Sequence, residues 1–286
     1  MGGSTPLLPI LALPRMFRQA SSEWINDNAP RLGASVAFYT LLSLAPLIVL
    51  AVAAAAVVYG QEAAQGRLAA EIRGAAGPEI ARTIQEFISG AYQPGTGLIA
   101  TLLGLATLVF SASSVFVELH DAMNTIWHVS PPPDRTNAAA IFRLIKDRSY
   151  SFATVLGTGF LLLLSLAVSA WIEAMHISVP RTATFLVSYV VITVLFAALY
   201  KIVPDVRLKW SDVALGAVIT SLLFMLGKEL MGLYFAHTGF GSAYSAAGSP
   251  MVVFLWVYYS AQLFFWGAEF SKVYKKTVDS QGNGQH

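Results

Sequence analysis

Six stretches of the chain are each long and apolar enough to cross a lipid bilayer as a helix. A transmembrane helix needs about 20 apolar residues to span the ~30 Å hydrocarbon layer. Because that layer offers the backbone no water, a segment that crosses it as a helix satisfies its own hydrogen bonds. The sequence therefore predicts an all-α, polytopic membrane protein with six transmembrane helices. The stretches are Ala34–Tyr59, Thr96–Val117, Phe152–Trp171, Ala183–Val203, Val213–Phe235 and Pro250–Ser271.

The composition agrees with lipid as the main surroundings. Charged residues make up only 12% of the 286 residues and hydrophobic residues 56%, whereas soluble chains carry roughly 25% charged residues. We divide the chain into a cytoplasmic N-terminus (1–33), a membrane domain (34–272) and a polar cytoplasmic tail (273–286). This division leaves no room for a separate soluble enzyme domain. The lack of cysteine excludes disulfides, thiolate metal sites and cysteine nucleophiles.

Lysine and arginine are unevenly divided between the two sides of the membrane. One side, formed by the N-terminus, the second and fourth loops and the C-terminus, carries most of the 18 basic residues. The loops of the opposite side carry only Arg67, Arg73, Arg82 and Arg181. Because basic loops stay in the cytoplasm, we expect both termini there.

The segment before the first span is predicted to be a short amphipathic helix, Leu11–Asn28. Apolar residues such as Met16, Ala20 and Trp24 recur on one face at helical spacing. Such a helix lies along the inner membrane surface or packs on the helix bundle, and the pattern fits both. We expect Pro30 to break the chain before the first span, since proline disfavours a helical residue in front of it.

Three other local features are expected along the chain. Pro46 lies near the middle of the first span and predicts a kink, because it cannot donate a backbone hydrogen bond. The long outside loop, 60–95, has the spacing of two short amphipathic helices that break at Gly77-Pro78. The polar end, Asp279–His286, is expected to be disordered.

Two polar groups lie where spans meet the cytoplasm. Asp27, Asn28 and Arg31 stand at the entrance to the first span. They form either an interfacial break with a basic anchor or a site for a substrate headgroup. Asp27 and Arg31 are four residues apart and would pair if the helix continued through Pro30.

The second group follows the second predicted span. Glu118 and Asp121 share one helical face, and His120 and Asn124 share the next. They form a polar helix end that meets basic loops, or a relay for protons or cations. A single histidine is poor evidence for a zinc site.

Charged residues within spans need their own explanation. Lys228 and Glu229 lie deep in the fifth span, where a charge costs about 2.5–3.5 kcal/mol on insertion scales. Such residues usually face a bundle interior or a wet cavity, although Lys228 could also extend to the outer interface. Glu269, near the inner end of the sixth span, lies three residues before Lys272 and is placed for an ion pair.

The outer turn between the fifth and sixth spans is the last candidate segment, and the sequence lacks the common catalytic motifs. The outer turn 239–248 is rich in glycine and forms either a plain connector or a re-entrant segment. The spans contain no convincing Ser-His-Asp order, phosphate-binding loop or His-x₃-His pair. We therefore expect no catalytic site, no metal and no cofactor. Spread basic residues without interleaved aromatics also argue against nucleic acid as a partner.

Four long segments resemble the YihY/virulence factor BrkB family of bacterial inner-membrane proteins. They are Trp24–Leu50, Ser111–Trp127, Tyr200–Gly216 and Tyr244–Tyr274. The resemblance implies six helices in the inner membrane with both termini inside. It also implies a role in envelope integrity or in the export of lipids or lipopolysaccharide precursors. The family has carried a ribonuclease label, which this sequence does not support, because it has no metal-binding histidine set.

Three functions follow as hypotheses. The first is a transporter or flippase-like protein for an amphipathic, anionic envelope lipid. In that hypothesis Arg31 and Lys228 meet the headgroup, and Glu118, Glu229 and Glu269 couple protons. The second is a membrane scaffold that binds partners through the outside loop and the N-terminal helix. The third is a membrane hydrolase, which requires a water-accessible acid–base pair.

Overall fold

The computed structural model describes residues 8–59, 66, 70, 72–73, 78–91, 114–129, 181–238 and 248–283. These residues are helical or lie in short turns, with no strand among them. The labelled helices are α1 (Leu8–Asn26), α2 (Ala29–Tyr59), α4 (Pro78–Ala91), α7 (Arg181–Ile202), α8 (Trp210–Thr238) and α10 (Gly248–Asn283). A further helix covers residues 114–126.

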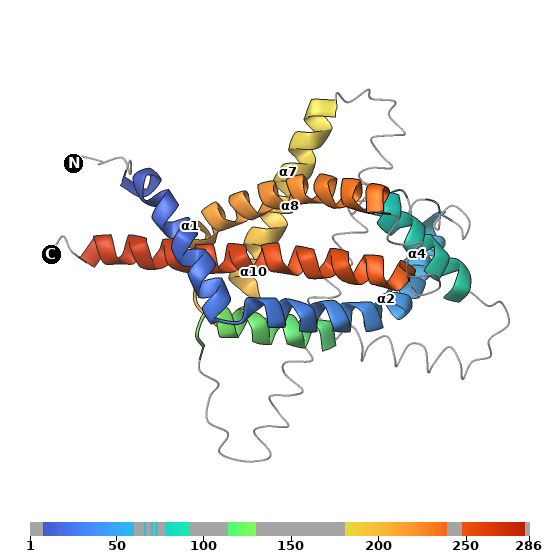
Figure 1. Cartoon of the computed structure of the whole chain (residues 1–286), viewed down its shortest axis with the longest axis horizontal. Coiled ribbons are helices and arrows are strands. Elements are labelled where there is room, and N and C mark those ends of the chain that lie inside the picture. The colour runs from blue at the N-terminus through green and yellow to red at the C-terminus, as the bar shows by residue number, and fades with distance from the viewer. Residues whose placement is uncertain are drawn as a thin grey trace, which may run out of the picture.

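The long helix α10 is the centre of the described part of the molecule. It contacts α1, α2, α4 and α8, and α7 packs on α8 (Figure 1). α1 and the last turns of α10 lie side by side at one end of the bundle, whereas α4 lies at the opposite end (Figure 1).

Three helices in the described part of the chain are long and apolar enough to cross a membrane. They cover Phe185–Ile202, Trp210–Phe235 and Pro250–Ser280. They correspond to the fourth, fifth and sixth predicted spans. The first predicted span is helical throughout as part of α2, and Pro46 lies within that helix. The third predicted span and most of the second fall outside the described residues, so six spans remain a prediction.

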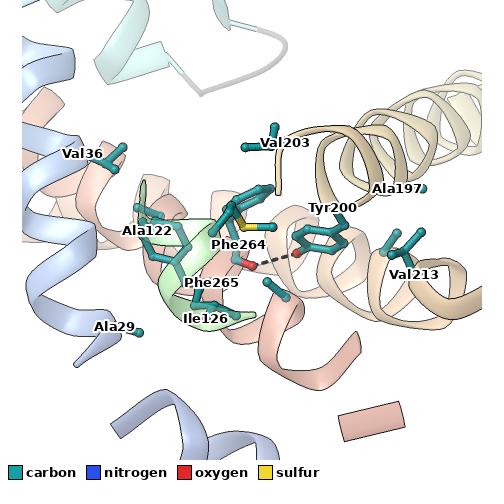
Figure 2. Close-up of a cluster of buried hydrophobic side chains, with 14 of the residues drawn as sticks. Ala29, Val36, Ala122, Ile126, Ala197, Tyr200, Val203, Val213, Phe264 and Phe265 are labelled. Atoms are coloured by element: carbon teal, nitrogen blue, oxygen red, sulfur yellow. Dashed lines mark hydrogen bonds between the residues drawn. The ribbon is translucent and has the colours of Figure 1, made fainter. Parts of the chain in front are cut away.

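The core at the α1 end joins segments from the whole chain. Its buried residues come from α2, the helix 114–126, α7, α8 and α10 (Figure 2). Tyr200 of α7 is fully buried there, and its hydroxyl donates to the backbone oxygen of Phe264 (2.9 Å) and lies 3.1 Å from Thr220 Oγ1. These bonds fix α7 against α8 and α10 with directional contacts, which apolar packing in lipid lacks.

Close packing of α8 on α10 depends on glycine. A Cβ at Gly216 would collide with Ser271 Oγ and with the Gly267 backbone oxygen, and a Cβ at Gly267 would collide with Thr220 and Tyr200. Small residues let helix backbones approach in membranes, where water does not drive helices together. The two helices therefore meet backbone to backbone at this level.

The predicted break between the N-terminal helix and the first span is present, but it lies at Asp27-Asn28, and Ala29 is already helical although it precedes Pro30. α1 ends at Asn26 and α2 begins at Ala29. Asn28 adopts a left-handed backbone with φ of 54°, a conformation that asparagine tolerates better than most residues. Pro30 lies in the first turn of α2, where its missing N–H has no helical acceptor to lose.

α1 packs on the helix bundle. Met16 and Ala20 are buried against Phe270 and Val273 of α10, and Trp266 Nε1 donates to Ser21 Oγ (3.1 Å). Of the two arrangements that the sequence pattern fits, the membrane surface and the helix bundle, this contact is the packing on the bundle. Whether the outer face of α1 also meets the membrane surface stays a prediction.

The prediction for the outside loop agrees with the structure, and the prediction for the C-terminal tail does not. α4 begins at Pro78, as predicted for the second helix of the outside loop, and Ile80 and Ile84 pack against Phe235 and Val252. The expected disorder of Asp279–His286 is wrong for 279–283, because α10 reaches Asn283. The ion pair of Lys275 with Asp279, four residues later, supports this polar helical extension.

Candidate functional site

The described charged residues converge most densely around Lys272. Lys272 Nζ lies 2.7 Å from Glu269 Oε2, 2.9 Å from Asp27 Oδ2 and 3.5 Å from Glu23 Oε2. His128 Nε2 lies 3.0 Å from Asp27 Oδ2 on the other side. We call these five residues the Lys272 cluster. It joins α1, the turn after the helix 114–126, and α10.

Local structure explains how each member reaches the cluster. Glu23 and Asp27 are four residues apart at the end of α1 and share its face toward α10. The Asp27 N–H still donates to the Glu23 carbonyl (2.8 Å), so Asp27 continues the last turn of α1. His128 follows the helix 114–126 and has a left-handed φ of 53°, which turns the chain sharply where the helix ends.

The cluster is largely shielded from solvent. The side chain of Glu269 is fully buried, those of Asp27 and Lys272 are 13% and 15% exposed, and that of His128 is 61% exposed. Three carboxylates therefore share one ammonium group, with histidine at the rim. Burial of charge is costly unless each charge is paired, so this balance of charges needs a further positive charge or a proton.

The pKa of Asp27 shows how its partners act. Burial by itself raises that pKa, but the neighbouring Glu269, His128 and Lys272 side chains, with the attraction of the Lys272 charge, outweigh it. The pKa of Asp27 is therefore held below its ordinary value of 3.8. Asp27 is the ionised carboxylate of the cluster at neutral pH.

A metal ion would have to compete with Lys272. One ligand atom each from Glu23, Asp27 and His128 lie within 4.8 Å of one another, a spacing that a cation could bridge. Lys272 Nζ, however, already contacts both of these carboxylates. The lysine thus supplies the positive charge at the position where a metal would bind.

A second polar network ties the helix 114–126 to the α7–α8 connection. His120 Nε2 lies 3.2 Å from Asp205 Oδ2, and Asn124 Nδ2 donates to the same oxygen (3.0 Å). In return the Asp205 backbone N–H donates to Asn124 Oδ1 (2.8 Å). The shared face of His120 and Asn124 that the sequence predicts is confirmed by these contacts with one residue.

His120 lies between two carboxylates. Its Nδ1 is 3.7 Å from Asp121 Oδ1, on the side away from Asp205. The neighbouring Asp121 carboxylate, followed by the Asp205 charge, outweighs the opposite effect of burial and raises the pKa of His120 above its ordinary value of 6.5. Both ring nitrogens thus face acidic groups, and neither is shown against a serine or threonine hydroxyl in the described region. The network is suited to a pH-sensitive structural contact.

The structure separates the predicted site residues. Lys228 Nζ lies 3.7 Å from Glu229 Oε1 in α8, and the Glu229 side chain is 77% exposed. Arg31 is exposed in the first turn of α2, and the ion pairs shown for Asp27 are with Lys272 and His128. Glu118 is half-buried on the helix 114–126. The outer turn 239–247 lies outside the described residues.

Of the predicted residues, Asp27 and Glu269 come together, and Lys272 joins them as the sequence spacing indicates. Sequence reasoning missed Glu23, His128 and Asp205 as partners. Glu23 was detectable, since it lies one helical turn before Asp27 in the predicted helix. No comparable signal exists for His128 and Asp205, because their partners lie far away along the chain.

Comparison with known proteins gives a consistent family. The model of the family described as "Virulence factor BrkB" matches residues 20–286. A UPF0761 membrane protein of Psychromonas ingrahamii is 26% identical over 266 residues, covering 90% of this chain and 86% of the relative. A UPF0761 membrane protein of Tolumonas auensis is 26% identical over 264 residues, covering 86% of this chain and 80% of the relative.

A longer relative occurs in Legionella pneumophila. This UPF0761 membrane protein is 26% identical over 289 residues, which cover 94% of this chain but 64% of the relative. No solved structure matches the chain. Since the family model matches nearly the whole sequence, from the middle of α1 onward, the chain belongs to the virulence factor BrkB family of membrane proteins.

Proposed function

We propose that the protein is a transporter or flippase-like exporter that moves an amphipathic, anionic envelope lipid across the bacterial inner membrane. The Lys272 cluster carries this proposal. Ionisable residues buried at the end of membrane helices usually mark ion or substrate pathways. In this cluster they come from three separate segments, so a change in their charge acts on how α1, α10 and the helix 114–126 fit together.

A role in proton coupling fits the cluster better than direct binding of an anion. Three carboxylates surround Lys272, and their charge repels a phosphate. Glu269 is therefore the coupling group in the proposal. The headgroup is assigned to basic residues outside the cluster, and Arg31, exposed in the first turn of α2, is the principal one.

The lipid part of the proposal rests on the outer surface of α7. Phe185, Val187, Val190 and Val194 are all more than half exposed. Apolar side chains along a transmembrane helix contact lipid tails. A substrate with a charged head and acyl chains would thus keep its tails in the bilayer while its head follows a polar route.

The experiment is a lipid-translocation assay with the purified full chain in vesicles. Fluorescent phosphatidylglycerol and phosphatidic acid represent anionic headgroups, and phosphatidylcholine is the zwitterionic comparison. We expect faster translocation of the anionic lipids than in protein-free vesicles. Equal rates with and without protein for these and other candidate envelope lipids would contradict the proposal.

The scaffold hypothesis makes a different prediction for the same molecule. It assigns partner binding to the outside loop, where the apolar face of α4 already packs against α2, α8 and α10. Among the side chains of α4 that the structure describes, those of Pro78, Arg82 and Gln85 are exposed. Loss of function on replacing exposed residues of α4, with full function in Glu269→Gln, would favour the scaffold over the transporter.

A further inference from the structure

The charge balance around Glu269 is the starting observation. Within the described residues, Glu269 contacts a single cation, Lys272, which it shares with Asp27 and Glu23. Although Lys272 Nζ is 2.7 Å from Glu269 Oε2, neither Glu269 oxygen has a well-directed hydrogen bond. A buried carboxylate without full compensation takes up a proton in preference to remaining charged.

The other charged groups around Glu269 do not remove this excess. From α1 come Glu23 and Asp27, both acidic. From the turn after the helix 114–126 comes His128, which contacts Asp27 and lies at the exposed rim. These groups leave more negative than positive charge beside Glu269 when His128 is neutral.

The charged groups on the remaining neighbouring helices point elsewhere. Arg31 of α2 is exposed. Asp212 of α8 accepts a hydrogen bond from the Lys209 backbone (2.9 Å), and Lys275 pairs with Asp279. The surplus negative charge at Glu269 is therefore a local property of the cluster.

Other buried polar atoms lie along the same face of α10. Gln262 precedes Glu269 by seven residues, two helical turns, and so shares its face. Gln262 Nε2 reaches the Pro30 carbonyl (3.4 Å), while its Oε1 is buried without a partner. The indole N–H groups of Trp24 and Trp127, packed on the adjoining core, are also buried without one. Polar atoms in this state are typical hydration sites.

We infer that Glu269 is a proton-binding site, that its carboxyl shares the bound proton with Asp27, and that its occupancy controls the docking of α1 on α10. On uptake, a proton from hydronium forms an O–H bond with a Glu269 oxygen and leaves water. The acid then donates to the Asp27 carboxylate. On release the O–H bond breaks, the proton passes to water to form hydronium, and three carboxylates repel one another across Lys272. Acidification thus holds α1 in place, and alkalinisation loosens it.

This inference rests on the proposed function and adds what the proton on Glu269 controls, the docking of α1 on α10; its test measures no transport. The first measurement is the pH-difference infrared spectrum of the purified full chain between about pH 5 and about pH 9, a range in which a carboxyl group with an ordinary pKa is already largely ionised. We expect a protonated-carboxyl C=O band that Glu269→Gln removes. Glu269→Asp should retain it at a shifted midpoint, and Asp279→Asn, an exposed site on the same helix, should leave it unchanged.

The second measurement reports the docking of α1. Because the chain has no cysteine, Ala20→Cys introduces a single thiol at a position that is fully buried against α10. Its labelling rate is divided by that of Arg18→Cys, an exposed position on the same helix, to remove the pH dependence of the thiol reaction. We expect the ratio to rise about tenfold on alkalinisation, the factor given by one unit of pKa difference between docked and undocked states.

The results distinguish failure of the inference from failure of the proposed function. In Glu269→Gln, which is neutral at every pH, the labelling ratio should stay low and flat. Persistence of the infrared band in that variant, or a ratio in the unsubstituted protein that does not change with pH, would overturn the inference. Failure of lipid translocation with both signatures present would overturn only the proposed function. Circular dichroism and size-exclusion profiles of each variant exclude loss of fold as the cause.

Discussion

Lys272 Nζ lies 2.9 Å from Asp27 Oδ2, across 245 residues of sequence. This contact fastens the end of α1 to α10 at the point where the chain turns into α2. Both side chains are mostly buried, and Glu269 contacts the same ammonium group. The bond that holds the N-terminal helix in place is thus part of a group of titratable residues, which makes α1 the element through which protonation can act.

Replacing Lys272 should destabilise the protein more than replacing a neighbouring lysine. Lys272→Ala leaves three carboxylates facing one another with their cation removed, a change that typically costs 3–5 kcal/mol for a buried pair. Lys276→Ala, at an exposed position one turn away, should cost less than about 0.5 kcal/mol. Thermal unfolding in detergent, followed by circular dichroism, measures both. Equal losses in the two variants would show that the cluster adds no stability.

Glycines at the α8–α10 contact should be sensitive to a single methyl group. Gly216→Ala and Gly267→Ala place a Cβ against neighbouring backbone or fully buried side chains, and overpacking typically costs 1–3 kcal/mol. Gly232→Ala is the matched control, since nothing lies within 4 Å of its Cβ position. The melting temperature should fall in the first two variants and stay or rise in the third. A fall in Gly232→Ala as large as in Gly216→Ala would contradict the packing described.

The contact of His120 with Asp205 should weaken as pH rises. The pKa of His120 in the folded protein is raised above its ordinary 6.5, so the charged contact contributes fully below that value. It is lost as pH increases through the raised folded pKa. The unsubstituted protein should therefore lose stability as the pH rises above 6.5, and His120→Gln should not show this loss. Melting temperatures measured against pH for both proteins test this, and parallel curves would rule the contact out as a source of pH dependence.

The pH dependence of stability expected from Asp27 is opposite to that expected from His120. The pKa of Asp27 in the folded protein lies below its ordinary value of 3.8. The stability that the ionised carboxylate contributes is therefore present above pH 3.8 and is lost as the pH falls through the lowered pKa of the folded protein. Asp27→Asn should flatten the acid limb of the stability curve. Asp279→Asn, whose carboxylate is 62% exposed, serves as the comparison. An unchanged acid limb in Asp27→Asn would mean that the Lys272 contact does not hold that carboxylate ionised.

The helices could be predicted from sequence because their signal is local. Hydropathy alone places α7, α8 and α10 within a few residues of their starts, and Asn28-Ala29-Pro30 marks the break after α1. The end of α10 was predicted too early, since apolarity shows where lipid ends and carries no information on where a helix ends. Polar residues with favourable spacing, such as Lys275 and Asp279, extend it.

The site could be predicted only in part, because its partners are distant along the chain. The spacing of Glu269 and Lys272 on one helix gives their ion pair directly. Nothing in the local pattern brings Asp27 to Lys272 or His128 to Asp27. These contacts depend on how α1 folds back over α10, which follows from the apolar face of Met16 and Ala20 and from the left-handed turn at Asn28. Asp27 pairs across this turn and not with Arg31, since the helix is interrupted at Asp27-Asn28 and Arg31 already belongs to α2.

Proton-coupled transport through Glu269 is tested most directly by lipid translocation under an imposed proton gradient. Vesicles that contain the unsubstituted chain, Glu269→Gln or Asp279→Asn are loaded with fluorescent phosphatidylglycerol, and its movement is followed with and without the gradient. We predict that the gradient accelerates translocation by the unsubstituted chain and by Asp279→Asn, and that Glu269→Gln shows no acceleration. Gradient-driven translocation that is equally fast in Glu269→Gln would contradict it.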